Sequence, residues 1–540
     1  MRKWLPLAVL SAAQFLMVLD QAVMNVSIST LVEDFDTTVT TIQGVITLYA
    51  LVMASLMLTG GKIGDIIGRR RTFAVGLVIY ATGSAITAVS QDVLVLGFGW
   101  SVLEGVGAAL VMPALVALVA GNYQGRDRVA AFGVIGGIAG VGIAVGPILG
   151  GWLTTYASWR VVFVGEVVVA IVILLLVGVI KEAKADEPRP QLDVVGSILS
   201  AVGLGLSVFG VLQASTWGWI KPVDSPVEPF GLALTPFVVA AGLVFLVAFT
   251  RWERLRERRG ETPLVRLDLL KIPQLSSGVA LFLLQNLILL GVFFTLPLYL
   301  QLVQGLNAFD TGVRMLPISI TMLVVSMSGP LLAGRFGPRR VVQAGFLTLA
   351  AAVVLLLSTI EPELDGYGFG FSSAVLGVGM GLIASQLGAV VQSAVGERDR
   401  SEAGGLQTTA MQLGSSLGTA FIGAIVLSGL TATFVSTAVD DARISENVKT
   451  SLEARSGVPF VSSEEVDQAA TDAGLPEQEV TAIVEAYEDS QLIALKVGLL
   501  VAAFIALGAL LLTGSLPGRG PPEGSSAPEG APPSPEAVSA

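Results

Sequence analysis

The chain of 540 residues contains no cysteine and no histidine. Without cysteine it has no disulfide and no thiol chemistry, so its redox compartment stays open. Without histidine it has no Ser-His-Asp triad and no HExxH zinc site, and proton transfer near neutral pH must use carboxyl groups in unusual surroundings. Residues 414–418 match the GxSxG pattern, but without a histidine base we interpret them as helix-packing glycine and serine. The sequence therefore predicts no enzyme.

Charged residues are scarce as well, at 14% of the chain against 53% hydrophobic residues. No GxxxxGK[ST] phosphate loop is present, so direct use of ATP is not supported, and we expect neither a cofactor, nor a bound metal, nor a nucleic-acid partner. Apolar runs long enough to cross a hydrocarbon core of ~30 Å recur along the chain. They are centred near residues 16, 53, 81, 104, 142, 171, 203, 241, 288, 321, 349, 380, 418 and 503. The sequence therefore predicts an all-α polytopic protein that crosses a lipid bilayer 14 times.

An even number of spans returns both ends of the chain to the same side. Most of the 31 lysine and arginine residues fall on the side of the N-terminus, and the densest group lies between Arg251 and Lys271. By the positive-inside rule that side is cytoplasmic. We therefore predict cytoplasmic termini and location in the plasma or inner membrane.

The acidic residues gather on the other side, mainly in an external insert at 432–490. Stretches beginning at Ser462 and Leu475 predict two capped amphipathic helices there. The insert is expected either to bind an external accessory protein or to be a solvated, negatively charged loop. Residues 514–540 are rich in Pro, Gly, Ser, Ala and Glu, which predicts a disordered cytoplasmic tail.

A basic, glycine-rich turn joins the second and third apolar runs. Glycine permits a sharp turn, the arginines mark the cytoplasmic face, and the one acid is placed to neutralise an arginine or to cap the next helix. We predict that the turn gates conformational change, and the alternative is an ordinary positive-inside loop. The predicted gating residues are Gly61, Gly64, Asp65, Gly68, Arg69, Arg70 and Arg71.

The fifth span carries glycines at intervals of four residues, together with a proline. Such spacing makes a smooth groove that lets a neighbouring helix approach closely, and the proline removes one backbone hydrogen bond. Simple glycine packing is the alternative interpretation. The residues are Gly142, Gly146, Pro147, Gly150 and Gly151.

A weak internal repeat divides the chain into two halves. Residues 334–340 follow the tenth span much as 65–71 follow the second, which indicates two related six-span halves with two extra spans between them. We predict a six-helix bundle at 1–185, two additional helices and a basic linker at 186–270, and a second six-helix bundle at 271–513 that includes the external insert.

Three motifs in this order resemble the major facilitator superfamily, and within it the fourteen-span drug:proton antiporters of the EmrB/QacA type. Leu19-Asp20-Gln-Ala-Val-Met-Asn25-Val is similar to the first-span pattern LDxTxxNVA, residues 61–71 to the loop signature, and residues 142–151 to the fifth-span GxxxGPxxGG motif. The resemblance implies the major facilitator fold, an antiporter helix in the fifth span, and outward transport.

Four positions depart from that pattern. Ser101 stands where the RxxQG motif has arginine, and Glu104 where it has glutamine. Glu166 stands where asparagine is usual, and Met411 where arginine is common.

Asp20, Glu104 and Glu166 therefore lie within spans of the first half, and no lysine or arginine lies deep in any span. Each ionised acid near the bilayer centre costs about 2.5–3.5 kcal/mol or more. Either these carboxyls face a watery cavity, or they hold protons at rest. We predict that they couple transport to protons, with helix packing as the alternative, and we expect Arg160 to pair with Glu166 at the outer boundary.

Other polar residues within the spans are predicted to line a substrate cavity, although interhelical hydrogen bonding explains them equally well. They are Asn25, Gln285, Asn286, Gln386, Gln407 and Gln412.

The sequence thus predicts a monomeric, proton-coupled exporter of amphipathic or cationic small molecules that works by alternating access. One alternative is an exporter of a lipid, glycolipid or siderophore-like product coupled to protons or sodium. Another is a membrane sensor without transport, which the intact motifs at 61–71 and 142–151 disfavour.

Overall fold

Residues 3–182, 192–396, 399–453 and 457–518 are described in the computed structural model. Within these ranges 14 helices are long and apolar enough to cross a membrane, and each predicted centre falls inside one of them. The same ranges contain helices and no strand. The prediction of an all-α polytopic membrane protein is confirmed.

The first six spanning helices pack as one bundle. α1 lies along α7, α6 packs against both α3 and α4, and α8 packs on α4. The elements are α1 Leu5–Val26, α2 Ile28–Asp34, α3 Val39–Ile67, α4 Arg69–Ala88, α5 Val93–Leu96, a π-helical segment Gly97–Glu104, α6 Gly105–Asn122, α7 Gly125–Tyr156, α8 Trp159–Leu176 and a 3-10 turn Val177–Val179.

The last six spanning helices form a second bundle of the same kind. α12 lies along α17, α16 packs between α13 and α15, and α20 packs on α17 and α15. The elements are α12 Pro273–Leu298, a π-helical segment Tyr299–Val303, α13 Ala308–Met327, α14 Gly329–Phe336, α15 Pro338–Leu357, α16 Gly366–Ser393, α17 Arg400–Asp440, α18 Glu446–Glu453, α19 Ser463–Asp472, α20 Glu477–Ala509 and a 3-10 helix Leu510–Ser515.

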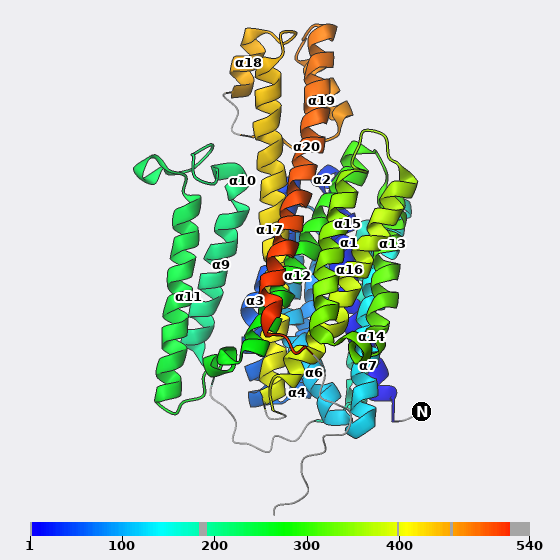
Figure 1. Cartoon of the computed structure of the whole chain (residues 1–540), viewed down its shortest axis with the longest axis vertical. Coiled ribbons are helices and arrows are strands. Elements are labelled where there is room, and N and C mark those ends of the chain that lie inside the picture. Colours follow the sequence, from blue (N-terminus) through cyan, green and yellow to red (C-terminus); the bar gives the residue numbers. More distant parts are fainter. Residues whose placement is uncertain (1–2, 183–191, 397–398, 454–456, 519–540) are drawn as a thin grey trace, which may run out of the picture.

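Two spanning helices between the bundles stand at the side of the molecule (Figure 1). α9 packs against α3 and α17, whereas α11 packs on α9 and on the short turn that follows it. The elements are α9 Val194–Leu212, α10 Ala214–Trp217, a 3-10 turn Pro229–Gly231, α11 Thr235–Arg258 and a 3-10 turn Leu267–Lys271. The predicted boundary at 185/186 lies outside the described residues.

The two bundles meet along two helix pairs, α7 with α13 and α3 with α17. Glycine permits the first contact, because a Cβ on Gly151 would lie 2.3 Å from the Ala308 carbonyl oxygen and one on Gly312 would lie 2.2 Å from that of Pro147. Hydrogen bonds add to both pairs: the Phe309 amide donates to Thr155 Oγ1 at 3.1 Å, and Gln43 Nε2 donates to the Thr419 carbonyl oxygen at 2.6 Å. The α7–α13 contacts begin near the predicted outer end at Gly151 and continue along both helices to Gly140 and Leu323.

The external insert is built largely by the spanning helices themselves. α17 has 41 residues and α20 has 33, more than the ~20 needed to cross a bilayer, and both project beyond the bundle with α18 and α19 beside them (Figure 1). The predicted helix after Ser462 is confirmed as α19, capped by the Ser462 hydroxyl. The predicted helix after Leu475 also forms, with acidic residues in its first turn, but it is the start of α20 and continues into the membrane instead of ending within the insert.

The predicted tail at 514–540 falls mostly outside the described residues. Its first residues complete the 3-10 helix that ends at Ser515, and the Pro517 carbonyl oxygen accepts a hydrogen bond from the Arg339 amide at 3.2 Å.

Substitution of Gly151 by valine tests the contact between the bundles. The added side chain would press on the backbone of α13, so we expect a loss of about 1–3 kcal/mol in stability, measured as a lower melting temperature in detergent. Gly137→Ala is the matched control, because a Cβ there meets nothing within 4 Å. A Gly151→Val protein as stable as the Gly137→Ala protein would contradict this account.

Candidate functional site

Three carboxyl groups from separate helices come together inside the first bundle. Asp20 lies on α1, Glu104 ends the π-helical segment before α6, and Glu166 lies on α8. Their exposed fractions are 0%, 0% and 2%. One oxygen from each lies within 4.8 Å of the other two. The structure thus brings the three predicted acids into one buried carboxyl cluster.

α4 supplies the hydroxyl groups of this cluster. Tyr80, Ser84 and Thr87 lie four and three residues apart, which places them on one face of the helix. The Tyr80 hydroxyl donates to Glu166 Oε2 at 3.0 Å and the Ser84 hydroxyl donates to the same oxygen at 3.1 Å. The sequence analysis overlooked these residues, although a polar stripe of this spacing in an apolar span was the signal that could have shown them.

Glycine and a local change of helix type let Glu104 reach this position. A Cβ on Gly83 of α4 would lie 2.6 Å from both Glu104 Cγ and the Gly99 carbonyl oxygen. Residues 97–104 form a π-helix, whose wider turn changes the direction of the side chains that follow and is often found at functional sites. The close approach of α4 therefore depends on Gly83 and fixes where Glu104 points.

Asp20 receives its hydrogen bond from a neutral donor. The Trp100 indole N–H donates to Asp20 Oδ1 at 2.7 Å. The Trp100 ring also stacks on Tyr49 of α3, with centroids 4.6 Å apart and planes 5° from parallel. Trp100 directly precedes Ser101, the position where the family motif has arginine. An uncharged indole thus stands beside the acid.

The cluster has no positive counter-charge among the described residues, since none of its acids forms an ion pair there. Asp20 Oδ2, Glu104 Oε2 and Glu166 Oε1 also have no hydrogen-bond partner in the described chain. Two unit charges 4.8 Å apart repel by about 3.5 kcal/mol at an effective dielectric constant of about 20. The cluster is therefore unfavourable with all three carboxyls ionised and has free oxygens that can hold protons.

The hydrogen bonds of Thr87 also indicate that Glu104 can hold a proton. Its hydroxyl has one proton and lies 2.9 Å from the Gly83 carbonyl oxygen and 3.3 Å from Glu104 Oε1. When that proton goes to the nearer oxygen, Glu104 can bond to Thr87 only as a protonated carboxyl that donates.

The predicted pair of Arg160 with Glu166 is wrong. Arg160 Nη1 instead donates to Asp34 Oδ2 at 2.5 Å, and its Nη2 donates to the Ser90 carbonyl oxygen at 2.9 Å. The Trp159 indole also donates to Asp34 Oδ2, at 2.9 Å. Sequence proximity misled here, because Arg160 in the first turn of α8 binds groups at the outer ends of neighbouring helices.

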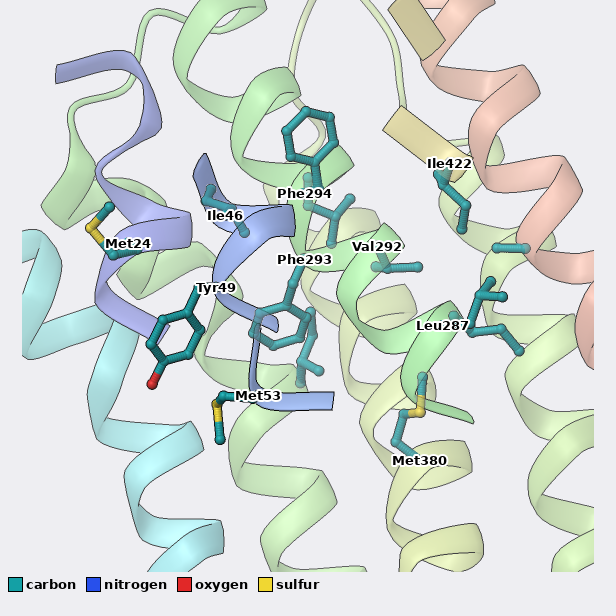
Figure 2. Packing of buried hydrophobic residues seen from close by; sticks show 14 of the residues in the cluster. Met24, Ile46, Tyr49, Met53, Leu287, Val292, Phe293, Phe294, Met380 and Ile422 are labelled. Atoms are coloured by element: carbon teal, nitrogen blue, oxygen red, sulfur yellow. The ribbon is translucent and has the colours of Figure 1, made fainter. Parts of the chain in front are cut away.

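Apolar side chains fill the space between the two bundles next to the cluster. Figure 2 labels Ile46, Tyr49 and Met53 of α3 and Phe293 and Phe294 of α12, which all belong to the same buried hydrophobic core. Tyr49 belongs both to this core and to the stack on Trp100. The carboxyl cluster is thus one aromatic pair away from the interface between the bundles.

The predicted cavity residues are placed differently. Asn25, Gln285, Asn286 and Gln386 are buried and donate to backbone carbonyl oxygens of Gln21, Met380, Phe282 and Gly329. Gln412 Nε2 lies 2.8 Å from the Met53 sulfur across the bundle interface, and Gln407 is half-buried. The bonds of Gln285, Gln386 and Gln412 join different helices, whereas those of Asn25 and Asn286 stay within their own helices. A role of these residues in binding substrate stays a prediction.

The predicted gating turn is held within the first bundle. Asp65 pairs with Arg69 at 3.1 Å, so it neutralises an arginine, which is one of its two predicted roles. Glu182, which follows α8, caps the start of α4 instead: its Oε1 accepts a hydrogen bond from the Arg70 amide at 3.2 Å. Gly68 has φ of +102°, which favours glycine, and a Cβ there would lie 3.3 Å from Glu182 Oε2. No pattern in the sequence pointed to Glu182.

The glycine-rich helix packs directly behind the carboxyl cluster. Cβ atoms on Gly142, Gly146 and Gly150 of α7 would lie 2.3–2.9 Å from Val18, Ala22 and Val23 of α1. Asp20 lies within that stretch of α1. The opposite contact, through Gly151, is with α13 of the second bundle. α7 therefore links the segment that carries Asp20 to the interface between the bundles.

Comparison with known proteins gives consistent results. The family model described as Major Facilitator Superfamily matches residues 10–419. The chain is 31% identical over 449 residues to the "Probable actinorhodin transporter" of Streptomyces coelicolor, covering 82% of this chain and 75% of that protein. It is 30% identical to the "Tetracenomycin C resistance and export protein" of Streptomyces glaucescens, covering 79% and 76%.

A third relative is the puromycin resistance protein of Streptomyces alboniger, which is 31% identical and is matched over 80% of this chain and 84% of its own. Among solved structures, an inward-facing, unoccupied bacterial homologue of the human lysosomal transporter Spinster superposes with a TM-score of 0.58. Its sequence identity is 14%, with 95% of this chain and 97% of that one covered. This likeness concerns the fold, and it confirms the expected arrangement of helices.

Substitution of Trp100 by phenylalanine tests the donor to Asp20. The stack on Tyr49 is retained while the indole N–H is lost, so we expect a loss of about 1–3 kcal/mol from an unsatisfied buried group. Melting temperature in detergent measures it. Trp4→Phe is the control, because Trp4 stacks on Tyr123 with its side chain partly exposed. Equal melting temperatures for the two variants would show that the Trp100–Asp20 bond contributes nothing.

The Asp34–Arg160 pair predicts a pH dependence outside the spans. Burial raises the pKa of Asp34, but hydrogen bonds from Trp159 and Arg160 and the Arg160 charge outweigh burial and lower it below its ordinary value. Its contribution to stability is therefore present above the unfolded pKa of about 3.9 and is lost as pH falls through the lower folded value. We expect Asp34→Asn to lower the melting temperature at pH 7, with the difference from wild type shrinking at pH 3. A difference that persists at pH 3 would contradict this.

Proposed function

Because the chain belongs to the major facilitator superfamily, we propose that it is a proton-coupled exporter of amphipathic or cationic small molecules. The observation that supports the proposal is the cluster of Asp20, Glu104 and Glu166, which are buried together and form no ion pair with any residue that the structure describes. The names of three relatives support the proposal as well: a probable actinorhodin transporter, a tetracenomycin C resistance and export protein, and a puromycin resistance protein.

The carboxyl cluster is the proton site in this proposal. In the outward-open form it takes up protons from outside, and in the inward-open form it releases them when substrate binds from the cytoplasm or the inner leaflet. Each proton that moves down 100 mV supplies about 2.3 kcal/mol, which sustains roughly a fifty-fold substrate gradient. The donors Trp100, Tyr80 and Ser84 hold the carboxyls in place in both protonation states.

The substrate region is the apolar interface beside Tyr49 and Met53 of α3 and Phe293 of α12. Aromatic and methionine side chains offer large, adaptable apolar surfaces, and methionine rearranges readily. Such a surface suits amphipathic compounds of varied shape. A substrate that moves Tyr49 also moves the Trp100 ring stacked on it, and with it the N–H that Asp20 accepts. Through this contact, binding of substrate and binding of a proton would be coupled.

α7 provides the second element of coupling. Its glycines at 142, 146 and 150 lie against α1 around Asp20, and its outer end packs on α13. Smooth glycine surfaces let helices slide with small changes in contact. A change of charge at Asp20 would therefore alter how α1 sits on α7, and α7 would carry that change to the second bundle.

Proteoliposomes with an entrapped pH indicator test the proposal. With an imposed pH gradient, addition of a cationic dye or of a neutral lipophilic compound should release protons through the wild-type protein. Three carboxyl oxygens within 4.8 Å are also suited to a small cation, so the assay is repeated with sodium replacing the pH gradient. A response to sodium alone would overturn proton coupling, and a response to neither gradient with any compound would overturn small-molecule export in favour of a lipid product or a sensor.

Asp20→Asn should abolish the proton response while substrate exchange without a gradient persists, because the neutral amide keeps the shape but cannot take up a proton. Asp92→Asn is the matched control. Asp92 is an exposed N-cap whose carboxylate accepts from the Val95 amide at 2.9 Å, and asparagine caps equally well. Proton-driven transport that survives in Asp20→Asn would remove Asp20 from the coupling site, with Glu104→Gln and Glu166→Gln tested in the same way.

A further inference from the structure

A groove runs between α9 and α11 on the side of the molecule. It has a volume of about 720 Å³ and its lining residues are Leu199, Leu243, Val244, Val247, Ala248, Arg251, Trp252 and Leu255. The wall is almost entirely aliphatic over the membrane-spanning part, and one arginine and one tryptophan lie near the end that the sequence assigns to the cytoplasm. Leu243, Val244 and Val247 are 51–66% exposed, so this part of the groove faces lipid.

Arg251 lines the cytoplasmic end of the groove, and two further arginines follow it on the same helix. Arg251, Arg254 and Arg258 are spaced by three and four residues on α11, which places them on one helix face. All three are exposed, and none forms an ion pair with another described residue. Arg256, between them in sequence, is instead used inside the fold, where it lies 3.4 Å from Asp193 and 3.3 Å from Glu261.

The acids of this region are turned away or already bound. Glu253 Oε2 accepts from the Val265 amide and Glu257 Oε1 accepts from the Leu267 amide, each at 3.1 Å. Asp193 accepts from the Trp252 indole N–H at 3.0 Å and also caps α9. Asp268 pairs with Lys271 at 2.5 Å. The hydrogen bonds and ion pairs of these acids are thus made with partners other than Arg251, Arg254 and Arg258, and Asp268 acts on Arg254 only through its charge.

The bond between Trp252 and Asp193 also sets the depth of the groove. Asp193 is the N-cap of α9 and Trp252 lies six residues before the end of α11, so both mark the cytoplasmic boundary of the two helices. Tryptophan is enriched at this level of a bilayer. Arg251 thus lies at the level of lipid headgroups, with the aliphatic wall beside the acyl chains.

We propose that the α9–α11 groove binds an anionic phospholipid of the inner leaflet. Its acyl chain lies along Leu199, Val244 and Val247, and its phosphate is held by Arg251 with Arg254 and Arg258 beside it. A guanidinium binds phosphate through paired hydrogen bonds, and basic pockets at the cytoplasmic side suit anionic headgroups. The lipid completes the packing of α11, which in the described chain contacts α9 and the 267–271 turn.

The proposal is tested by native mass spectrometry of the full-length protein, exchanged into nanodiscs of equal parts phosphatidylglycerol and phosphatidylcholine and then released into detergent. We expect the wild type to retain phosphatidylglycerol in preference to phosphatidylcholine. Each arginine near the phosphate is worth about fivefold in affinity, so Arg251→Gln should reduce retention about fivefold and the Arg251→Gln, Arg254→Gln double variant should reduce it further.

Two further variants separate this site from general attraction to a charged membrane. Val247→Trp fills the groove but keeps every arginine, and it should lose the retained lipid. Arg335→Gln removes one cytoplasmic guanidinium from the second bundle, where Arg335 lies over the Phe336 ring, and it should retain lipid as the wild type does.

Equal retention of the two lipids by the wild type would overturn the proposal. So would a loss in Arg335→Gln as large as that in Arg251→Gln, or unchanged retention in Val247→Trp. A lipid-free dimer in the same spectra that Val247→Trp converts to monomer would assign the groove to a second copy of the chain instead.

Discussion

Three acids must be buried in an apolar bundle, and none of them pairs with a lysine or arginine in the part of the chain that the structure describes. Much of the first bundle follows from this constraint. Two of the carboxyls accept from neutral donors, Asp20 from the Trp100 indole and Glu166 from the Tyr80 and Ser84 hydroxyls, while Glu104 lies beside the Thr87 hydroxyl. These donors come from helices next to the acids, so the cluster ties α1, α4, α8 and the segment before α6 to one another. A buried acid that is held in place but not neutralised is suited to exchanging a proton.

Close helix packing is what makes this arrangement fit. Gly83 lets α4 approach Glu104, and Gly146 lets α7 approach α1 beside Asp20. In a membrane, water does not drive helices together, so association depends on such close contacts and on buried hydrogen bonds. The same glycine surfaces reach the second bundle through Gly151 and Gly312. Local packing at the acids and contact between the bundles are thus parts of one continuous structure.

The carboxyl cluster gives a physical interpretation of one departure from the family motifs, the serine at position 101. Ser101 carries no charge where the family motif has arginine, and the neighbouring Trp100 gives Asp20 a hydrogen bond without charge and stacks on Tyr49. The cluster is then free to change its own charge. At the periphery, α9 and α11 add an arginine-bearing lipid-facing surface, and α17 and α20 extend outward as the external insert. Both additions lie away from the carboxyl cluster.

The sequence by itself determined the number and order of the spans, the acids within them and the motifs at 61–71 and 142–151. These follow from hydropathy, charge and glycine spacing, which are local properties of the chain. Tertiary structure decided which groups meet: Glu166 with Tyr80 rather than Arg160, Arg160 with Asp34, and Arg70 with Glu182. It also turned the segment after Leu475 into the start of α20. The π-helical turn at 97–104 and the close approaches at glycine are set by neighbouring helices far away in sequence, so no local pattern could show them.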